Sequence, residues 1–323
     1  MSLVRLSVGD RARGFKKLVS NWIGGRPIGT TLELTRRCNA RCDYCGHWQE
    51  PRRQELDADG WVDVVRTLAP LAVTVCGGEP FMRRDCLEIV GRIKALPGYR
   101  YVAIITNGHF LSRDRAKALV DTGIDQINIS LNFPDERQDA DRKLPGLYSR
   151  ISDIVPWMTA QGADVQLNTI LMRDNLDDVL TIVERARTWG SKVLFTLYSE
   201  LPGANHAHSY TPAEIPRMEA LCQRFIELRR SHGLVANEEW YLQKIPDYLR
   251  GERIGGCTAG RKTVHITPEG MVRPCAELDP VGHYKTFRAA DQPQLACTAC
   301  FQACRGEAQS PLTPKRVVEY LVA

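Results

Sequence analysis

The sequence lacks the long apolar segments that carry a protein into or through a membrane. No run of about 18 apolar residues occurs in the 323 residues, which excludes an ordinary transmembrane helix. The first six residues lack the apolar core and the small-residue cleavage site of a secretory signal. We therefore expect a cytoplasmic protein.

The sequence also lacks a strong charge of one sign, low-complexity segments and repeats of fixed period. The formal net charge is +5 and is spread along the chain, so a nucleic-acid partner is not expected. Hydrophobic residues make up 43% and charged residues 25%, which excludes disordered, collagen-like and coiled-coil chains. This length allows about two domains, or one large barrel with an appendage.

Cysteine, in contrast, is abundant. The eleven cysteines cannot all pair, and disulfides are not expected in a reducing cytoplasm. Three of them lie within residues 38–45 and five lie between positions 257 and 304. Clustered thiols in a reducing compartment typically hold metal.

Apolar strands and amphipathic helices alternate from residue 30 onward. We expect strands at 30–35, 72–75, 101–106, 126–130, 165–171 and 192–197, and helices at 58–68, 85–96, 112–122, 147–161, 176–189 and 212–231. Ser112 is the expected cap of its helix. Six β-α units predict an α/β fold, a partial (β/α)6 TIM-like barrel.

The two ends of the chain break this pattern. Residues 11–24 predict an amphipathic helix, whose apolar stripe we expect to pack on the barrel and not on a membrane surface. Beyond about 235–250 the sequence predicts a small C-terminal cluster domain, with a hairpin formed by 263–267 and 271–273 and a last helix at 314–321. The predicted division is 1–29, 30–235 and 236–323.

The first cysteine cluster, Cys38-x3-Cys42-x2-Cys45, directly follows the first strand. Loops after parallel strands open on one edge of the sheet, where ligands gather. Three thiolates hold three irons of a [4Fe–4S] cluster and leave the fourth iron open to a ligand. The alternative is a structural zinc site with His47 as its fourth ligand.

The second strand ends in Gly77-Gly78-Glu79-Pro80. Two glycines let a ligand approach the backbone closely, and Glu79 offers a carboxylate to a cation such as an ammonium group. Alone this segment is typical of a turn. Its position after the second strand places it on the same edge as the cysteine loop.

These two loops together resemble the radical S-adenosylmethionine (SAM) superfamily, over about residues 30–235. The resemblance implies that Cys38, Cys42 and Cys45 hold a [4Fe–4S] cluster whose open iron chelates SAM. It implies that Gly77, Gly78 and Glu79 meet the methionyl amino group. Reductive cleavage of SAM then gives a 5′-deoxyadenosyl radical, which takes a hydrogen atom from the substrate.

The same resemblance implies further contacts with SAM. Tyr44 takes the place of an aromatic residue near the adenine, and Arg142 matches an arginine that meets the SAM carboxylate. A solvated surface charge is the alternative for Arg142. The remaining implied SAM-binding positions are Thr106, Asn107, Ser130 and Asn132. Many relatives have Ser-Leu-Asp after the fourth strand, whereas this chain has Asn132 in place of the aspartate.

The C-terminal cysteines are Cys257, Cys275, Cys297, Cys300 and Cys304. Four thiolates make either a zinc site or a fully ligated [4Fe–4S] cluster. In this context the segment resembles the short SPASM/twitch extension, with one auxiliary cluster. We expect Cys257, Cys275, Cys297 and Cys300 as ligands, with Cys304 either spare or replacing one of them.

The resemblance implies an enzyme of oxidoreductase type that needs a one-electron reductant such as flavodoxin or ferredoxin. The expected substrate is a small polar metabolite of sugar, aminocyclitol or nucleoside type, since no leader-binding domain precedes residue 30. The alternative is crosslinking or epimerisation of a ribosomal peptide; a lipid substrate or a non-catalytic electron carrier is less expected. Three residues of loop 198–210 are candidates for substrate contact or proton transfer, or ordinary loop residues: Glu200, His206 and His208.

Overall fold

The structure is a computed structural model that describes residues 8–51, 53–201, 205–311 and 313. Its central feature is a nine-stranded sheet with the order β6-β5-β4-β3-β2-β1-β7-β8-β9. The first six strands pair in parallel with their neighbours. Their bounds are β1 Gly29–Glu33, β2 Ala72–Cys76, β3 Tyr101–Thr106, β4 Gln126–Ser130, β5 Val165–Leu171 and β6 Lys192–Leu197.

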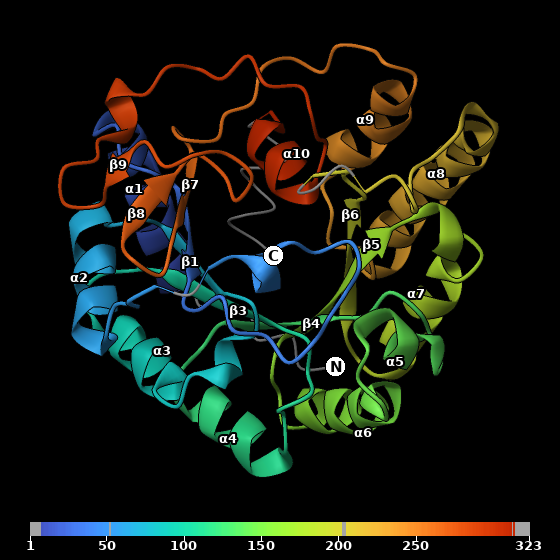
Figure 1. The fold of residues 1–323 in the computed structure, drawn as a ribbon, viewed down its shortest axis with the longest axis horizontal. Coiled ribbons are helices and arrows are strands. Elements are labelled where there is room, and N and C mark those ends of the chain that lie inside the picture. Colours follow the sequence, from blue (N-terminus) through green and yellow to red (C-terminus); the bar gives the residue numbers. More distant parts are fainter. Residues whose placement is uncertain (1–7, 52, 202–204, 312, 314–323) are drawn as a thin grey trace.

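Helices surround this curved sheet as an outer ring (Figure 1). Those that follow the first strands are α2 Ala58–Leu68, α3 Cys86–Ala95, α4 Arg113–Asp121, α6 Leu147–Ala160 and α7 Val179–Thr188, and the short α5 Arg137–Arg142 precedes α6. The expected cap of α4 is present, because Ser112 Oγ accepts a hydrogen bond from Arg115 N at 3.2 Å. The prediction of a partial six-unit α/β barrel is confirmed.

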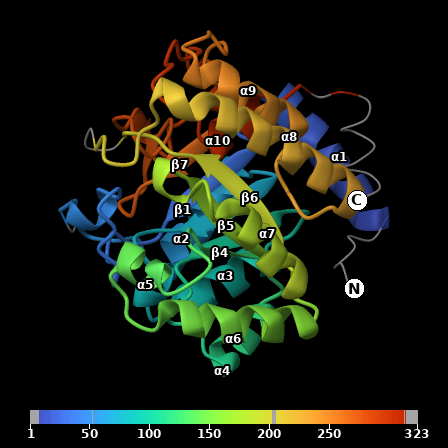
Figure 2. The same ribbon diagram turned by 90° about the vertical axis from the view of Figure 1, so that its right-hand side faces the viewer.

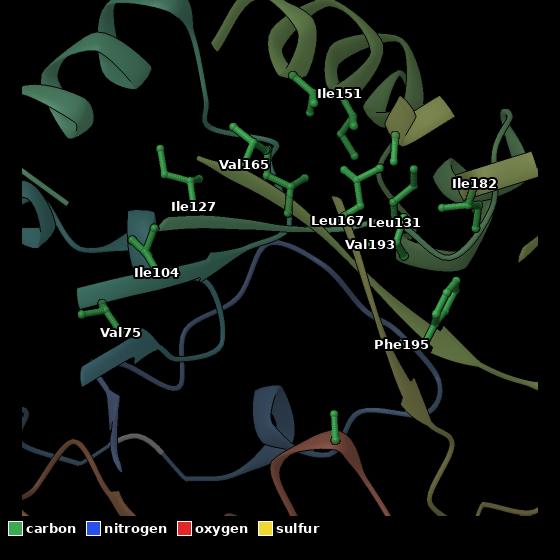
Figure 3. Packing of buried hydrophobic residues seen from close by; sticks show 14 of the residues in the cluster. Val75, Ile104, Ile127, Leu131, Ile151, Val165, Leu167, Ile182, Val193 and Phe195 are labelled. Carbon is green, nitrogen blue, oxygen red and sulfur yellow. The ribbon is translucent and has the colours of Figure 1, made fainter. Parts of the chain in front are cut away.

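Alternate residues of each strand build the core between the sheet and the helices. Ile104, Ile127 and Leu167 are fully or almost fully buried and point toward Ile151 of α6 and its neighbouring helices (Figure 3). The residues between them in sequence point to the opposite face, which the curved sheet encloses. That inner face is largely polar and includes Thr74, Asn128, Gln166 and Asn168.

The C-terminal hairpin extends the sheet of the barrel. β7 (Thr263–Ile266) pairs in parallel with β1, with Leu32 opposite Ile266. β8 (Met271–Arg273) and the two-residue β9 (Gly282–His283) follow in antiparallel fashion. The sheet therefore runs across the predicted boundary near residue 235, and the division of the chain into domains stays a prediction. The helix expected at 314–321 lies outside the described residues.

Three further helices complete the described chain: α8 Ile215–His232, α9 Glu239–Leu249 and α10 Ala303–Gln309. The helix expected at 212–231 starts with a 3-10 turn at Pro212–Glu214 and continues as α8. α9 and α10 were not predicted from the sequence. None of the helices in the described part of the chain combines the length and the apolar character that a membrane span requires.

The first helix, α1 (Val8–Ile23), docks on the barrel through its polar side. Asn21 is fully buried, and its Nδ2 donates to the carbonyl oxygens of Pro27 at 2.9 Å and Ala69 at 3.0 Å. The apolar stripe faces solvent instead, with Trp22 67% and Ile23 82% exposed. The expectation that this stripe packs on the barrel is wrong, because the hydrogen bonds of Asn21 orient the helix.

Candidate active site

The cysteine loop and the glycine loop lie against each other at the carboxyl edge of β1 and β2. Gly78 N donates to Thr35 O at 2.6 Å, and Glu79 N donates to Arg37 O at 2.8 Å. A Cβ atom on Gly77 would lie 2.6 Å from Thr35 O, and one on Gly78 would lie 2.5 Å from Arg37 O. The absence of side chains at Gly77 and Gly78 therefore lets the backbone of residues 35–37 pack against this loop. The sequence suggested instead that the two glycines make room for a ligand.

The three thiols of the first cluster lie close enough to affect one another's pKa. Cys42 is buried, and Cys38 and Cys45 are half-buried. Burial raises the pKa of Cys38 to about 11, and the two neighbouring thiols add to this shift. Cys38 Sγ accepts from Ala40 N at 3.4 Å. Binding of iron to these thiols would therefore release protons.

The zinc alternative for the first cysteine cluster requires several ligands grouped around one ion. Within the described ranges, no three or more His, Cys, Asp or Glu side chains are grouped so that they would hold one metal ion. His47, which the zinc alternative requires as a ligand, turns its Nδ1 toward Glu33 at 3.4 Å.

Glu79 joins the glycine loop to the end of β3. Its side chain is fully buried, and its carboxyl accepts hydrogen bonds from Thr106 Oγ1 and Asn107 N, both at 2.8 Å. Burial outweighs these bonds and raises the pKa of Glu79 to about 7. Asn107 Nδ2 also donates to Asn39 Oδ1 of the cysteine loop at 2.9 Å. Thr106 and Asn107 thus lie beside the two loops, and their contact with SAM stays a prediction.

Asn132 is part of a buried network with Tyr44 and Asp141. Its Nδ2 donates to Tyr44 OH at 2.8 Å and to Asp141 Oδ2 at 3.0 Å, while Tyr44 OH donates to Asp141 Oδ2 at 2.9 Å. Asn132 Oδ1 accepts from Ile170 N at 3.0 Å. Because Asp141 of α5 already supplies a carboxylate to this network, an amide donor at position 132 is what pairs with it.

Arg142 lies in the same network and faces the cysteine loop. The residue is 9% exposed, its Nε lies 3.1 Å from Asp141 Oδ2, and its Nη1 donates to Cys42 Sγ at 3.6 Å. Its guanidinium carbon lies 5.6 Å from the centre of the Tyr44 ring. The alternative of a solvated surface charge is therefore wrong. Ser130 lies at the end of β4, where its carbonyl accepts from Gln138 Nε2 at 3.1 Å.

Of the three candidates in loop 198–210, the structure brings one to the cysteine loop. His208 contacts Asp174 through Nδ1 and Asp43 Oδ1 through Nε2 at 3.2 Å, and its ring meets Tyr44 edge-on at 5.8 Å. Asp174 and Asp43 outweigh burial and raise the pKa of His208. His206 and Glu200 instead pair with each other at the surface, at 3.0 Å.

A buried acid, missed in the sequence analysis, ends β1. Glu33 is 1% exposed, and its carboxylate lies 3.2 Å from His265 Nε2 of β7 and 3.4 Å from His47 Nδ1. Burial favours the neutral acid, but the two histidines outweigh it and lower the pKa of Glu33 to about 2. A glutamate inside an otherwise uncharged strand was the available signal; its histidine partners emerge only in the folded chain.

A second ionic contact ties the cysteine loop to the C-terminal hairpin. Arg36, whose side chain is 6% exposed, hydrogen-bonds through both terminal nitrogens to Glu269 in the turn between β7 and β8. Its Nε lies 2.9 Å from Glu50 Oε2. The segment that enters Cys38 is thus held to the hairpin that leads to Cys275.

The C-terminal thiols lie within electrostatic reach of one another. Burial raises the pKa of Cys300, and Cys257 and Cys297 add to this shift. Burial likewise raises the pKa of Cys304, with further contributions from Cys300, Cys275 and Cys257. Arg305, which is 4% exposed, donates to the carbonyls of Cys300 and of Gly255 near Cys257, and so joins the two segments. Which four of the five thiols are ligands stays a prediction. The isolated Cys86 and Cys222 are buried.

Comparisons with known proteins agree with this site. The family model of the radical SAM superfamily matches residues 32–186. The PqqA peptide cyclase of Methylocella silvestris is 30% identical over 287 residues, covering 82% of this chain and 72% of that protein. The PqqA peptide cyclase of Methylobacterium nodulans is 29% identical over 299 residues, covering 87% and 76%.

Solved structures show the same fold at lower identity. Streptococcus suis SuiB bound to its precursor peptide SuiA superimposes with a TM-score of 0.66 at 16% identity, covering 85% of this chain and 67% of that chain. The protein anSMEcpe with bound AdoMet gives a TM-score of 0.64 at 15% identity, covering 91% and 97%.

These findings correct the expected substrate and establish the family. The expectation of a small polar metabolite is wrong, because relatives that match over most of the chain are peptide cyclases. The two loops of the site and the family match agree on the cofactor chemistry. This chain belongs to the radical SAM superfamily and is an enzyme of its SPASM/twitch type, which uses a SAM-binding [4Fe–4S] cluster, SAM and an auxiliary [4Fe–4S] cluster.

Proposed function

We propose that this enzyme modifies a ribosomally made peptide, by forming a crosslink within it or by epimerising a residue. The observation that carries the proposal is the similarity to PqqA peptide cyclases, which extends over 82% of the chain and well beyond the superfamily core. SuiB, which shares the fold, was solved with a precursor peptide.

The residues at the carboxyl edge fit the cofactors of the superfamily. Cys38, Cys42 and Cys45 would hold the cluster, and Asn39 Nδ2 between them is a buried donor with no hydrogen-bond partner in the described structure. A bound acceptor would satisfy that donor. When bound, the cluster and SAM supply a radical that removes a hydrogen atom from the substrate.

The chain's own groups orient SAM and keep water away from it. The buried guanidinium of Arg142 suits a carboxylate, and the carboxyl of Glu79 suits an ammonium group. Tyr44 is fixed by Asn132 and Asp141, so its ring is held beside Arg142 as a rigid wall. The site thus offers a cation for the carboxylate of SAM, a carboxyl for its ammonium group and an aromatic ring for its apolar part.

The inner face of the barrel offers groups that suit a peptide backbone. Gln166 Nε2 donates to Asn128 Oδ1 at 2.8 Å and to Asn168 Oδ1 at 3.1 Å. Asn128 and Gln166 lie opposite each other on β4 and β5. Their amides carry both donors and acceptors, as a peptide does, and they lie on the strand that ends at Ser130 and on its neighbour. Asn128 is 4% and Gln166 6% exposed, so a peptide would take over hydrogen bonds that these amides make with each other.

The second cluster site suits a net oxidation. Four of the five thiols from Cys257 to Cys304 would hold the auxiliary cluster, which supplies a one-electron acceptor when bound. An external one-electron donor such as a flavodoxin or ferredoxin would reduce the first cluster.

The proposal is tested by anaerobic assay of the iron-loaded full chain with SAM and dithionite. A library of ribosomally translated peptides is compared with a panel of sugars, aminocyclitols and nucleosides, and 5′-deoxyadenosine and substrate masses are measured. We expect peptides that lose two hydrogen atoms, or that incorporate solvent deuterium without a mass change in water. Modification confined to the small molecules would overturn the proposal. The Cys38/Cys42/Cys45→Ala triple variant is the blank.

A matched pair of variants separates peptide binding from SAM cleavage. Asn128→Leu removes an amide from the inner face, whereas Leu180→Ser alters an exposed residue on α7. We expect Asn128→Leu to raise the KM for the peptide and to leave peptide-independent SAM cleavage unchanged, and Leu180→Ser to change neither.

A further inference from the structure

The outer face of α1 is the most apolar exposed surface of the described chain. Only six large hydrophobic side chains are exposed among the described residues, and four of them lie on this one helix. Their exposed fractions are 43% for Phe15, 38% for Val19, 67% for Trp22 and 82% for Ile23. An exposed apolar cluster of this kind is typical of an interaction surface.

The orientation of α1 is set by the barrel and leaves this face free. Asn21 is fully buried and binds the carbonyls of Pro27 and Ala69, and a Cβ atom at Gly14 would lie 3.0 Å from the Tyr99 ring. Phe15, Val19 and Trp22 recur at helical spacing on the opposite side. The helix is thus fastened by its polar side, with its apolar side outward.

Basic groups flank the apolar side. The side chains of Lys16 and Arg26 are exposed and form no hydrogen bond or ion pair with other side chains of the described residues, and Arg13 is exposed beside Asp10. Asp10 is the one acidic residue of α1. Burial and the positive charges of Arg26 and Arg100 lower the pKa of Lys17 on the adjacent side. This surface is therefore apolar in its middle and cationic along one border.

The position of α1 leaves the active site accessible. Its contacts, Pro27 and Ala69, precede β1 and β2, so α1 lies at the amino edge of the sheet, whereas both cysteine-bearing and glycine-bearing loops follow the strands at the carboxyl edge. Figure 2 shows α1 at the border of the molecule. A large partner bound to α1 would thus approach from the side opposite the cysteine-bearing and glycine-bearing loops.

We propose that the outer face of α1 binds the surface of an anionic lipid bilayer, with Trp22, Ile23, Phe15 and Val19 in the interfacial region and Lys16 and Arg26 at the headgroups. An apolar helix face bordered by lysine and arginine is the arrangement that lies in the plane of such a surface. A second copy of this chain fits less well, because a symmetric pair would bring like charges together. The proposal is independent of the proposed substrate.

The test is flotation of the full, iron-loaded chain with lipid vesicles. We expect flotation with phosphatidylcholine vesicles that contain phosphatidylglycerol, roughly tenfold weaker binding to phosphatidylcholine alone, and weakening by added salt. Trp22→Ser/Ile23→Ser should weaken binding roughly tenfold or more, since two large apolar side chains no longer leave water. Lys16→Glu should weaken binding to the anionic vesicles and leave binding to pure phosphatidylcholine vesicles unchanged.

Matched controls make the result decisive. Leu180→Ser/Val281→Ser alters two exposed apolar residues outside α1 and should leave flotation unchanged. Equal melting curves and iron content show that each variant is folded. Absence of flotation with anionic vesicles, or flotation that the Trp22/Ile23 variant leaves intact, overturns the proposal. A dimer seen by light scattering and lost in that variant, without vesicle binding, also overturns it in favour of a second copy.

Discussion

Nε2 of His265 lies 3.2 Å from Oε2 of Glu33, although 232 positions separate the two residues in the sequence. Together with the contact between Arg36 and Glu269, this pair joins the strand that leads into Cys38 to the hairpin that leads to Cys275. The relative position of the two cysteine sets therefore depends on buried charges as well as on the sheet. Because Glu33 is almost fully buried, replacing either partner has a measurable cost.

Stability should fall in acid because of Glu33. The folded-state pKa of Glu33 is lowered from 4.5 to about 2, so its contribution is present above pH 4.5 and is lost as the pH falls toward 2. The shift corresponds to about 3 kcal/mol at neutral pH. We expect Glu33→Gln to lower the unfolding free energy by about this amount at pH 7 and to flatten its decline below pH 4.5, measured by urea unfolding of the iron-free chain.

The exposed Glu88 on α3, which pairs with Arg92, provides the control for Glu33. Glu88→Gln should change stability by less than about 1 kcal/mol, since exposed ion pairs contribute little. Equal effects of the two substitutions would show that the buried pair has no special role.

The Arg36–Glu269 contact should be asymmetric in cost. Arg36→Met leaves Glu269 without its cation and leaves Glu50 with Arg273, whereas Glu269→Gln leaves Arg36 beside Glu50. We expect a loss of about 3 kcal/mol for Arg36→Met and a smaller loss for Glu269→Gln, with the double variant close to Arg36→Met. Urea unfolding of the three variants measures this; strictly additive losses would contradict a direct contact.

Alanine at Gly78 should disrupt the proposed SAM site. Its Cβ would lie 2.5 Å from Arg37 O, so the glycine loop must move away from the cysteine loop. We expect SAM affinity, measured by equilibrium dialysis on the iron-loaded chain, to fall at least about tenfold, together with a stability loss of about 1–3 kcal/mol. Gly91→Ala in α3 is the control, because the nearest atoms to its Cβ would be those of Thr122, at 3.8 Å. This substitution should be neutral or stabilising by about 0.5–1 kcal/mol.

An exchange of side chains tests the network of Asn132 and Asp141. Asn132→Asp removes a donor and sets two carboxyl groups side by side, in a place where burial already raises the pKa of Asp141. We expect a loss of about 3 kcal/mol in unfolding free energy. Asn132→Asp/Asp141→Asn restores one amide and one carboxylate and should recover most of it. Failure of the double variant to recover would mean that Tyr44 and Arg142 require the carboxylate at position 141.

Iron analysis separates the two cysteine sets. The reconstituted wild-type chain should hold about eight irons, and the Cys38/Cys42/Cys45→Ala variant about four. Cys297→Ala and Cys304→Ala in that background then identify the spare thiol, since the variant that keeps four irons has lost a residue outside the ligand set. A fall to no iron in the triple variant would place zinc, or nothing, at the C-terminal cysteines.

Much of the site was predictable because its signals are local. Three cysteines within eight residues, and a glycine pair after a strand, need no knowledge of the fold. The apolar run of Tyr101–Thr106 and the alternation of Gln126–Ser130 predicted those strands at their observed bounds. The partners of Asn132 and Arg142 were not predictable, because α5 is a short polar helix without apolar periodicity.

Patterns in the sequence were sufficient to predict the barrel and the family and to single out the clustered cysteines, since these depend on spacing along the chain and on stretches one strand or helix long. Three features emerge only in the folded chain: Glu33 meets His265, Asn132 donates to Asp141, and α1 turns its apolar side outward. Each of these depends on which surfaces come together once loops close over long stretches of sequence. Buried charges and hydrogen bonds then select one arrangement, because unpaired polar groups are costly away from water.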